Sequence, residues 1–558
     1  MNSTDQKTIV IIGGVAGGAG AAAKARRTDE RAEIVLFERG PYVSFANCGL
    51  PYYVSDEIQR REDLLLQNPQ GFWNRFRVKV HVRHEALRID RKAKQVEVKN
   101  LASGETFFQK YDKLVLSPGA EAIVPPLPGL PSANVFTLKT VPDSDAVRDW
   151  ISREKPRRAV VVGAGFIGLE SAEALQRRGL GVSVVELLPQ VLPPFDADMA
   201  AFVARRLEEK GIQLILGDGV KAFQGSPAAR AVVLESGREI PADLILLSIG
   251  VRPELKLARE CGLVIGGAGG IVVDERQQTS DPDIFAAGDA TEVVHLVTGK
   301  KTRIPLAGPA NKEGRVAGAN AAGGRLTFPG ALGTAIVECL GLTAAKTGLS
   351  EREAAKEGLP YAVSFTHSPD HAGYYPGSAM IHMKLVFEKE SGRLLGAQAV
   401  GERGVDKRID VIAAALCARM KVSDLENLDL AYAPQFSSAK DPVIMAGSAA
   451  ANIVRGEIIP ITIEALRRRL HDKDDIQLVD VRTPAECKSG GLPGAVRIPI
   501  DEFRNRLSEM NPRKETVVYC RVGFRGYLAA RILGQSGFDR VLNLSGGILS
   551  ASPSDLVF

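Results

Sequence analysis

The sequence lacks a long apolar stretch, a secretion signal and paired cysteines. No apolar run of about 20 residues occurs in the 558-residue chain, so we expect no membrane-spanning helix. The opening MNSTDQKTIV does not show the basic and then apolar pattern of a signal peptide. The six cysteines are scattered without CxxC spacing, which argues against a disulfide scaffold or a zinc site and predicts a cytoplasmic protein.

A strong excess of one charge is also missing. The 71 basic residues stand against 66 acidic ones, and the formal net charge of +5 gives no argument for nucleic-acid binding. It still allows a local basic patch for an anionic ligand. Aromatic residues are few at 6%, and the remaining composition is ordinarily globular. At roughly 100–200 residues per domain, a chain of this length is expected to form three or four domains.

A glycine-rich turn follows the first apolar run. KTIVIIGGVAGGAGAAAKARR predicts a buried strand, a tight turn and a helix, and Glu38 ends the next apolar run. Small residues let the backbone approach a pyrophosphate at the helix N-terminus, and the carboxylate can bind ribose hydroxyls. Because Val15 occupies the middle glycine position, an ordinary strand-to-helix turn is the alternative. The glycines expected to bind the cofactor are Gly13, Gly14, Gly17 and Gly18.

A second turn of the same kind strengthens the first. AVVVGAGFIGLESAEAL has the full GxGxxG spacing at Gly163, Gly165 and Gly168. Glu186 closes the following strand, and an acidic residue there favours the unphosphorylated ribose of NADH over that of NADPH. Two such units predict two dinucleotides, one of them a flavin, because hydride from a nicotinamide needs an acceptor that can pass electrons on.

A third motif carries a family resemblance. TSDPDIFAAGDA resembles the second flavin-binding motif of flavoprotein pyridine nucleotide-disulfide oxidoreductases, which implies that Gly288 and Asp289 contact FAD and that Asp289 binds its ribityl chain. SPGA, with Gly119, and SIGVRP resemble the strands that cross between the flavin and nicotinamide domains. The resemblance runs from residue 7 to about residue 450.

Cys48, in SFANCGLPYY, is expected to be the redox centre. Dithiol members of the family carry a second cysteine about five residues later, where this chain has Tyr53. A lone thiolate can hold a substrate as a mixed disulfide, accept the outer sulfur of a persulfide, or cycle through a sulfenic acid. The alternative to a redox role is an inert, buried Cys48.

The sequence around Cys48 resembles that of coenzyme A-disulfide reductases and NADH-dependent persulfide reductases. This resemblance implies that Ser44 and Asn47 lie beside the thiol arm of coenzyme A. It also implies that Lys24 and Arg27 meet the phosphates, a task that suits their charges. Lys440 would be a further contact. The alternative for Lys24 and Arg27 is an ordinary solvated basic face.

Two tyrosines are expected to act from a partner subunit. Tyr374, in HAGYYPG, and Tyr432, in DLAYAPQF, fall where the family has its dimerisation domain. The resemblance places such tyrosines over the cysteine, where a phenol can donate a proton to a leaving thiolate. Tyr375 competes with Tyr374 for this role, and half-buried interface aromatics are the alternative for both. Action across an interface requires a homodimer.

The last hundred residues resemble a rhodanese domain, from about Ile463 onward. In CRVGFRG, Cys520 follows a strand and opens a loop that Arg525 closes. The amides of such a loop, with a helix N-terminus, form an anion pocket that stabilises a persulfide. Four residues separate Cys520 from Arg525, one fewer than in related phosphatases. The tighter loop favours a terminal sulfur over a phosphoryl group. Asp480 and Arg482 are expected to form buried hydrogen bonds.

These resemblances imply an α/β protein with two Rossmann-like dinucleotide-binding domains, an α+β dimerisation domain and a small α/β rhodanese domain. The FAD-binding domain is expected to be discontinuous. The expected ranges are 1–120 and 250–326 for FAD, 121–249 for NAD(P)H, 327–450 for dimerisation, 451–465 for a linker and 466–558 for rhodanese.

The function that follows is an NADH- and FAD-dependent reductase of coenzyme A persulfide or polysulfide that releases hydrogen sulfide, with coenzyme A as substrate or as a tightly bound group. One rival is a coenzyme A-disulfide reductase with a separately acting sulfurtransferase. Another is an NADH oxidase or peroxidase whose rhodanese domain is a docking module. Neither nucleic acid nor a membrane is an expected partner. The cysteines expected to be structural are Cys261, Cys339, Cys417 and Cys487.

Overall fold

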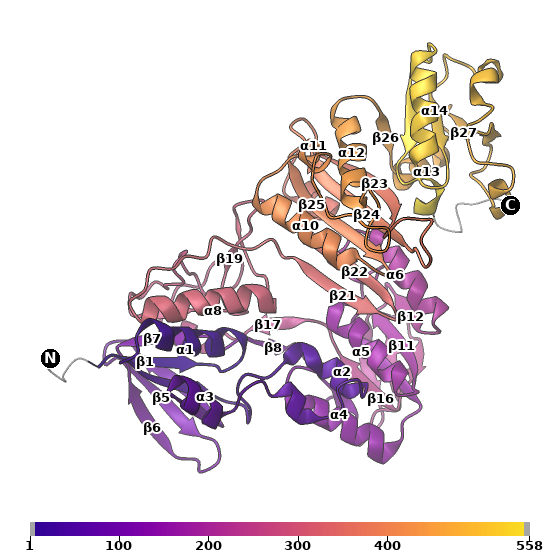
Figure 1. The fold of residues 1–558 in the computed structure, drawn as a ribbon. Helices are drawn as coiled ribbons and strands as arrows, with labels where there is room; N and C mark the ends of the chain where they lie inside the picture. Colours follow the sequence, from indigo (N-terminus) through magenta and orange to yellow (C-terminus); the bar gives the residue numbers. More distant parts are fainter. Residues whose placement is uncertain (1–5, 552–558) are drawn as a thin grey trace. The chain divides into compact units, whose positions relative to one another are not determined.

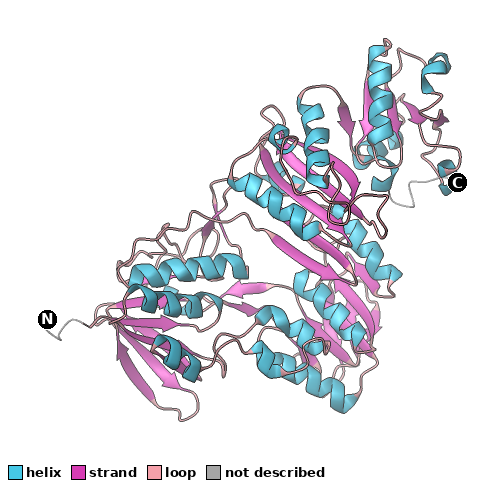
Figure 2. Ribbon diagram, in the orientation of Figure 1, coloured by secondary structure: helices cyan, strands magenta, loops and turns pink. Residues whose placement is uncertain are grey.

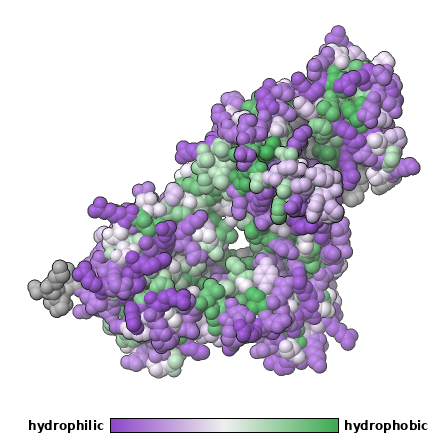
Figure 3. Space-filling view, in the orientation of Figure 1, coloured by the Kyte–Doolittle hydropathy of each residue, from purple (hydrophilic) through white to green (hydrophobic). Residues whose placement is uncertain are grey.

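The computed structural model of the chain describes residues 6–551, and its elements are labelled in Figure 1. Two compact units are present, one formed by Met1–Pro193 and Ala204–Gly333, the other by Pro194–Val203 and Thr334–Phe558. Both mix helices and strands (Figure 2), in agreement with the expected α/β class. Polar side chains cover most of the face drawn in Figure 3. Within the described range, no helix is long and apolar enough to cross a membrane.

The first unit begins with a five-stranded parallel sheet in the order β18-β7-β1-β2-β3. Its inner strands are almost wholly apolar and buried, as expected where helices or other elements cover both faces. Its strands are β1 (Thr8–Ile12), β2 (Glu33–Glu38), β3 (Val78–Val82), β7 (Lys113–Leu116) and β18 (Ile284–Ala286). A separate antiparallel sheet contains β4 (His84–Asp90), β5 (Gln95–Asn100) and β6 (Thr106–Lys110).

Helix α1 (Ala16–Thr28) packs closely against α8 (Ala307–Ala321), which lies beside it in Figure 1. Small residues make this approach possible. A Cβ atom added to Gly314 would lie 2.2 Å from the carbonyl oxygen of Gly17, and one added to Gly318 would lie 2.1 Å from that of Ala21. The contact therefore joins the start of the chain to a segment about 300 residues later, around the first glycine turn.

A second parallel sheet, in the order β12-β11-β10-β16-β9, repeats the first arrangement. Its strands are β9 (Val135–Phe136), β10 (Arg158–Val162), β11 (Gly181–Glu186), β12 (Gln213–Leu216) and β16 (Leu244–Leu247). An antiparallel sheet of β13 (Val220–Gln224), β14 (Ala231–Leu234) and β15 (Glu239–Pro241) accompanies it. Helices α4 (Val141–Glu154) and α5 (Phe166–Arg177) belong to this part, and α6 (Ala197–Glu209) follows.

The two segments expected at the domain crossings pair with each other. Strand β8 (Ala120–Ala122) lies antiparallel to β17 (Val251–Pro253), with Ala120 opposite Pro253. The chain thus leaves and re-enters the first sheet through one two-stranded ribbon, and α7 (Lys256–Glu260) follows on return. This is the connection that a discontinuous first domain requires.

The second unit opens with an antiparallel sheet in the order β21-β22-β25-β24-β23. Its strands are β21 (Ala335–Cys339), β22 (Leu342–Gly348), β23 (Tyr361–Pro369), β24 (Met380–Glu388) and β25 (Leu394–Gly401). The helices of this part are α9 (Glu351–Lys356), α10 (Val405–Cys417), α11 (Val422–Leu425) and α12 (Pro442–Val454).

The last part is a parallel sheet in the order β26-β30-β29-β27-β28. It contains β26 (Ile459–Ile461), β27 (Gln477–Asp480), β28 (Val496–Arg497), β29 (Thr516–Tyr519) and β30 (Val541–Leu544), with α13 (Ile463–His471) and α14 (Phe524–Gln535). Apolar clusters pack on both faces, one around Val518 and the other around Val517. The range expected to be a linker, 451–465, contains the end of α12, strand β26 and the start of α13.

Candidate functional site

The first glycine turn is built for close backbone approach. Gly13 has a φ of +92°, and a Cβ added to Gly18 would lie 1.8 Å from the Gly13 carbonyl oxygen. Glu38, at the end of β2, accepts hydrogen bonds from the amides of Gly14 and Gly40, both at 2.7 Å. The turn lies at the C-terminal end of β1, where α1 begins, and its residues fit a dinucleotide.

The second turn reproduces this geometry. Gly163 has a φ of +102°, and a Cβ added to Gly168 would lie 2.0 Å from the Gly163 carbonyl oxygen. Glu186 accepts hydrogen bonds from the amides of Ala164 at 2.7 Å and Leu188 at 2.9 Å. Gly165 lies directly before the first residue of α5. Both carboxylates predicted to bind ribose therefore also close their own glycine turn.

A buried carboxyl group of α8 binds the third predicted cofactor segment. The amide of Gly288, which has a φ of +87°, donates to Glu313 at 2.6 Å, and the Thr291 hydroxyl donates to the same oxygen at 2.9 Å. Asp289 forms an ion pair with Lys139 at 3.6 Å. Burial raises the pKa of Glu313, a residue that sequence motifs did not single out.

Cys48 is exposed in a short 3-10 helix, Asn47–Gly49, that runs into α2 (Leu50–Val54). Tyr53 fills the position of the second cysteine of dithiol relatives. Its buried ring lies under the Arg148 guanidinium, 4.1 Å from the centroid, and its hydroxyl donates to Asp145 at 3.3 Å. The residue that replaces the second sulfur therefore fixes α2 to α4.

Opposing charges act on the Cys48 thiol. Although the residue is exposed at the surface, desolvation by the surrounding protein raises the pKa of the thiol most; the Glu170 carboxylate raises it further, Lys139 lowers it and Asp289 raises it. Glu170, on α5, accepts a hydrogen bond from the Tyr52 hydroxyl at 3.1 Å, and burial raises its own pKa. Neither Glu170 nor Lys139 was expected from the sequence.

The residues predicted to bind coenzyme A lie on two elements of the first unit and one loop of the second. Lys24 and Arg27 are three positions apart on α1, and Arg27 is exposed. Ser44 has a φ of +50°, and its amide donates to the Gly14 carbonyl at 2.7 Å, which joins the Cys48 loop to the first glycine turn. Asn47 precedes Cys48, and Lys440 is exposed.

The two predicted tyrosines meet in the second unit. The hydroxyls of Tyr374 and Tyr432 are 3.0 Å apart, and these residues are 77% and 49% exposed. Tyr375 instead packs edge-on against the ring of His371, with centroids 5.7 Å apart. The structure therefore separates the two neighbours: Tyr374, and not Tyr375, forms a hydrogen-bonded pair with Tyr432.

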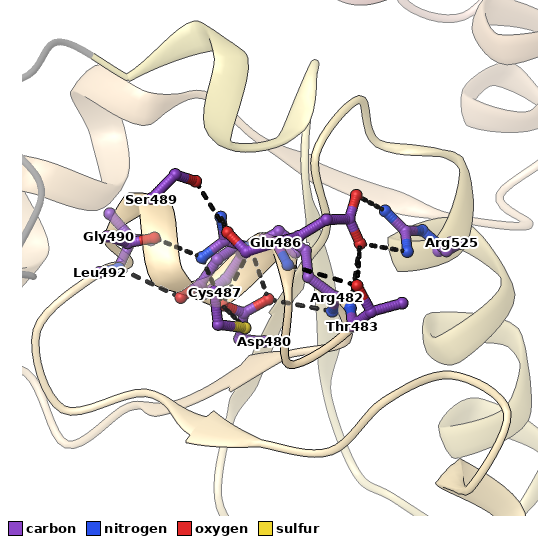
Figure 4. A network of polar contacts seen from close by, with 10 residues as sticks. Asp480, Arg482, Thr483, Glu486, Cys487, Ser489, Gly490, Leu492 and Arg525 are labelled. Atoms are coloured by element: carbon purple, nitrogen blue, oxygen red, sulfur yellow. Dashed lines mark hydrogen bonds and ion pairs between the residues drawn. The ribbon is translucent and has the colours of Figure 1, made fainter.

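The second predicted sulfur site surrounds Cys520, directly after β29. The thiol is buried, and its sulfur accepts a hydrogen bond from the amide of Gly523 at 3.1 Å, at the N-terminus of α14. Arg525, expected to close the loop around the sulfur, directs two guanidinium nitrogens at the carboxylate of Glu486, at 2.7 and 2.6 Å (Figure 4). Sequence reasoning did not find Glu486.

A buried ion pair holds the segment between β27 and β28, which carries Glu486 (Figure 4). Arg482 donates to Asp480 at 2.9 and 2.7 Å and to the carbonyl of Gly490 at 2.6 Å. Both charged groups are almost completely buried, so their expected structural role is confirmed. Among the four cysteines expected to be structural, Cys339 and Cys487 are buried, Cys261 is half-buried and Cys417 is exposed. Across residues 6–551, no cluster of His, Cys, Asp and Glu could hold a metal ion.

Comparison with known proteins gives consistent matches along the chain. The family model for pyridine nucleotide-disulphide oxidoreductases matches residues 7–314, and the model for their dimerisation domain matches residues 335–442. A rhodanese-like domain matches residues 462–551.

Individual relatives agree with these family matches. The NAD(P)H sulfur oxidoreductase (CoA-dependent) of Pyrococcus abyssi is 37% identical over 79% of this chain and 97% of its own. The crystal structure of reduced Bacillus anthracis CoADR-RHD is 43% identical, with a TM-score of 0.96 over 100% of both chains. The NAD-dependent persulfide reductase from A. fulgidus is 39% identical, with a TM-score of 0.92 over 98% of this chain and 100% of its own.

Proposed function

Because the chain belongs to the pyridine nucleotide-disulphide oxidoreductase family, we propose that it is an NADH- and FAD-dependent reductase of persulfide and polysulfide sulfur, with coenzyme A persulfide as substrate and hydrogen sulfide as product. One observation carries the proposal. The lone exposed Cys48, with Tyr53 in place of a second cysteine, occurs in the same chain as the loop cysteine Cys520. In the proposed reaction Cys48 reduces the sulfane sulfur and Cys520 supplies it.

The residues that would hold the cofactors are those of the two glycine turns. Glu38 and the turn at Gly13 suit the adenosine part of FAD, and Asp289 suits its ribityl chain. Glu186 and the turn at Gly163 suit NADH. When bound, these cofactors supply the electron pair for sulfur reduction. NADPH is the alternative donor, and the relative from Pyrococcus abyssi is named as an NAD(P)H enzyme.

Cys48 carries the sulfur through two balanced steps. First its thiolate attacks the outer sulfur of coenzyme A persulfide; a new S–S bond forms, the old one breaks, and the thiolate of coenzyme A leaves. Then the cysteine persulfide takes up two electrons and one proton, and yields hydrogen sulfide and the Cys48 thiolate. The Tyr374–Tyr432 pair of the partner subunit in a homodimer would donate a proton to the departing thiolate.

The remaining predicted residues serve recognition and sulfur supply. Lys24 and Arg27 would bind the phosphates of coenzyme A, Lys440 would be a further contact with it, and Ser44 and Asn47 would lie beside its thiol arm. Cys520 would hold sulfane sulfur from external donors as a persulfide, stabilised by the Gly523 amide at the N-terminus of α14. The sulfur then passes to coenzyme A or to Cys48.

The deciding experiment measures sulfide release and NADH consumption together, without oxygen, on coenzyme A persulfide and on coenzyme A disulfide. We expect faster turnover on the persulfide, with one sulfide per NADH, and loss of this activity in Cys48→Ser. Cys417→Ser, which removes another exposed cysteine, is the matched control and keeps full activity. Faster turnover on the disulfide without sulfide would refute the proposal and favour a coenzyme A-disulfide reductase, the reading suggested by the CoADR-RHD relative.

A further inference from the structure

The two loops that carry the paired tyrosines are joined to each other below the surface. The first, residues 370–379, connects β23 to β24 and carries Tyr374. The second, residues 432–441, precedes α12 and carries Tyr432. Besides the contact between the two hydroxyls, the amide of Ala372 donates to the carbonyls of Pro434 at 3.2 Å and Ser437 at 3.1 Å. The loops therefore form one layered structure whose outer face presents the phenols.

Arg408 lies at the base of this structure. It comes from the first turns of α10 and is 1% exposed, the largest of the fully buried side chains in the described residues. Its guanidinium donates to the Asp370 carbonyl of the first loop at 2.7 Å and to the Asp441 carboxylate of the second loop at 2.9 and 3.2 Å. A single buried side chain thus binds both tyrosine loops.

The partners of Arg408 are themselves fixed. Asp441 caps α12 by accepting from the Val443 amide at 2.9 Å, and it also accepts from the Ser437 hydroxyl at 2.6 Å. The Ser437 hydroxyl accepts in turn from Arg408 at 3.2 Å. Gly404, with a φ of +69°, leaves space for the guanidinium, since a Cβ there would lie 2.3 Å from Arg408 Nη1. Every group around the guanidinium is therefore held by a second contact.

The first loop has its own brace beside the ion pair. The Asp370 carboxylate accepts from the amides of His371 at 3.0 Å and Ala379 at 2.8 Å, which closes the loop at both ends. The His371 ring contacts Asp370 and the Pro376 carbonyl. These contacts fix the shape of the loop, whereas Arg408 and the Ala372 amide tie it to the second loop from below.

We propose that the buried Arg408–Asp441 ion pair is the positioning element that holds Tyr374 and Tyr432 as one hydrogen-bonded unit. Arg408 touches neither phenol; it acts through the backbone of one loop and the capping carboxylate of the other. The functional part of this inference rests on the proposed function, in which the pair serves sulfur reduction. A charged pair at this depth is costly to break from one side, because the remaining charge is left buried without a partner.

The first test uses Arg408→Lys and the matched control Arg403→Gln. Arg403 is exposed; it lies near the Asp370 carboxylate and donates a hydrogen bond to the Gly377 carbonyl, so its replacement removes a surface contact of the first loop without opening the buried pair. We expect amide hydrogen exchange in 370–379 and 432–441 to rise about tenfold or more in Arg408→Lys, because the loops open locally when their tie is lost, whereas exchange in 432–441 is expected to stay unchanged in Arg403→Gln. Unchanged exchange in Arg408→Lys would overturn the proposal.

The second test separates positioning from general stability. We expect Arg408→Lys to lower kcat on coenzyme A persulfide by about tenfold or more, with KM for NADH unchanged, because the phenols lose their alignment. In a Tyr432→Phe background, Arg408→Lys is expected to lower kcat no further, since the hydrogen bond between the two tyrosines is already broken. If the losses in kcat from the two substitutions simply add, a positioning role for Arg408 is contradicted.

Two further variants keep the test decisive. If Arg408→Lys does not fold, Ser437→Ala removes one bridging hydroxyl and is expected to produce the same pattern in smaller degree. A double variant, Arg408→Met with Asp441→Leu, keeps apolar volume without charge; wild-type exchange and kcat in that variant would also overturn the proposal. If the wild type does not reduce coenzyme A persulfide, the proposed function fails, while the exchange measurements still decide the role of the ion pair.

Discussion

At Cys48, groups of both signs act on one sulfur. Glu170 and Asp289 disfavour the thiolate and Lys139 favours it, while desolvation by the surrounding protein also raises the pKa of the thiol. The proposed chemistry needs the thiolate, so the balance among these side chains sets how much reactive sulfur is present at a given pH. Tyr52, four positions after Cys48, binds Glu170, so the carboxylate is held in place by the helix that follows the cysteine.

This balance predicts opposite effects of two substitutions. Glu170→Gln removes a negative charge and lowers the pKa of Cys48, whereas Lys139→Met removes a positive charge and raises it. Alkylation of Cys48 by iodoacetamide at neutral pH is therefore expected to become several-fold faster in the first variant and several-fold slower in the second. The measurement is the alkylation rate against pH, with mass spectrometry to identify the modified cysteine. Shifts in the same direction in both variants would contradict this account.

At the second sulfur site, the ion pair between Glu486 and Arg525 predicts a pH dependence. The Arg525 guanidinium lowers the pKa of Glu486 from 4.5 to about 2. Because the folded-state pKa is depressed, the pair stabilises the fold above pH 4.5, and this stabilisation is lost as the pH falls from 4.5 towards 2. The difference in free energy of unfolding between wild type and Glu486→Gln is thus expected to shrink over that range.

Hydrogen exchange in 516–535, which covers β29 and α14, measures this difference between pH 5 and pH 2.5. Lys514→Gln, which removes an ion pair with Asp475 on the same part of the chain, controls for a general effect of acid. A constant difference between wild type and Glu486→Gln across the range would show that the pair does not titrate as described.

At the scale of elements, the close contact of α1 and α8 depends on Gly314. A methyl group there would lie 2.2 Å from the Gly17 carbonyl oxygen and would push the helices apart beside the first glycine turn. Gly314→Ala is therefore expected to destabilise the protein by about 1–3 kcal/mol and to weaken FAD retention. Gly308→Ala on the same helix meets no atom within 4 Å and is expected to change stability by less than about 1 kcal/mol.

Thermal unfolding and flavin content after gel filtration measure both effects. If the two alanine variants behave alike, helix propensity rather than close packing decides the outcome. A larger loss of flavin in Gly314→Ala than in Gly308→Ala supports the packing argument even when the unfolding temperatures are close.

Elements could be predicted from the sequence where the conformation of a few neighbouring residues restricts which amino acids fit. The glycine turns are such a case, because a positive φ at Gly13 and Gly163 and the close approach of Gly18 and Gly168 exclude side chains. Glu486 also lies in a local sequence pattern that could have identified it. It follows Thr483 by three residues, and the two exchange hydrogen bonds as in a capping box.

Other site residues could not be found from local patterns. Arg408 meets partners 33 and 38 positions away, Asp441 and Asp370, and nothing in its own segment indicates that contact. The choice of Tyr374 over Tyr375 depends on a hydroxyl 58 positions away, at Tyr432. Such contacts depend on how the whole antiparallel sheet and its helices fold.

At the scale of the whole molecule, the chain joins a reductase to a rhodanese-like domain. The proposed division of labour predicts that Cys520→Ser abolishes sulfur transfer from thiosulfate but leaves reduction of added coenzyme A persulfide unchanged, because only Cys48 carries the reduced sulfur. Cys487→Ser, which replaces a buried cysteine in the same part of the chain, is the control.

Parallel assays of thiocyanate formation from thiosulfate and of NADH-dependent sulfide release measure the two activities. Unchanged thiosulfate activity in Cys520→Ser would favour a docking module without turnover. Loss of both activities would mean that sulfur reaches Cys48 only through Cys520.

The two carboxylates that close the glycine turns have a consequence for the entropy of cofactor binding. Glu38 and Glu186 each accept one backbone hydrogen bond on each oxygen, so half of their four acceptor positions are used. The unused half leaves acceptors for the two hydroxyls of a ribose. Each turn is held by hydrogen bonds of its own, so nucleotide binding need not spend interaction energy on fixing it.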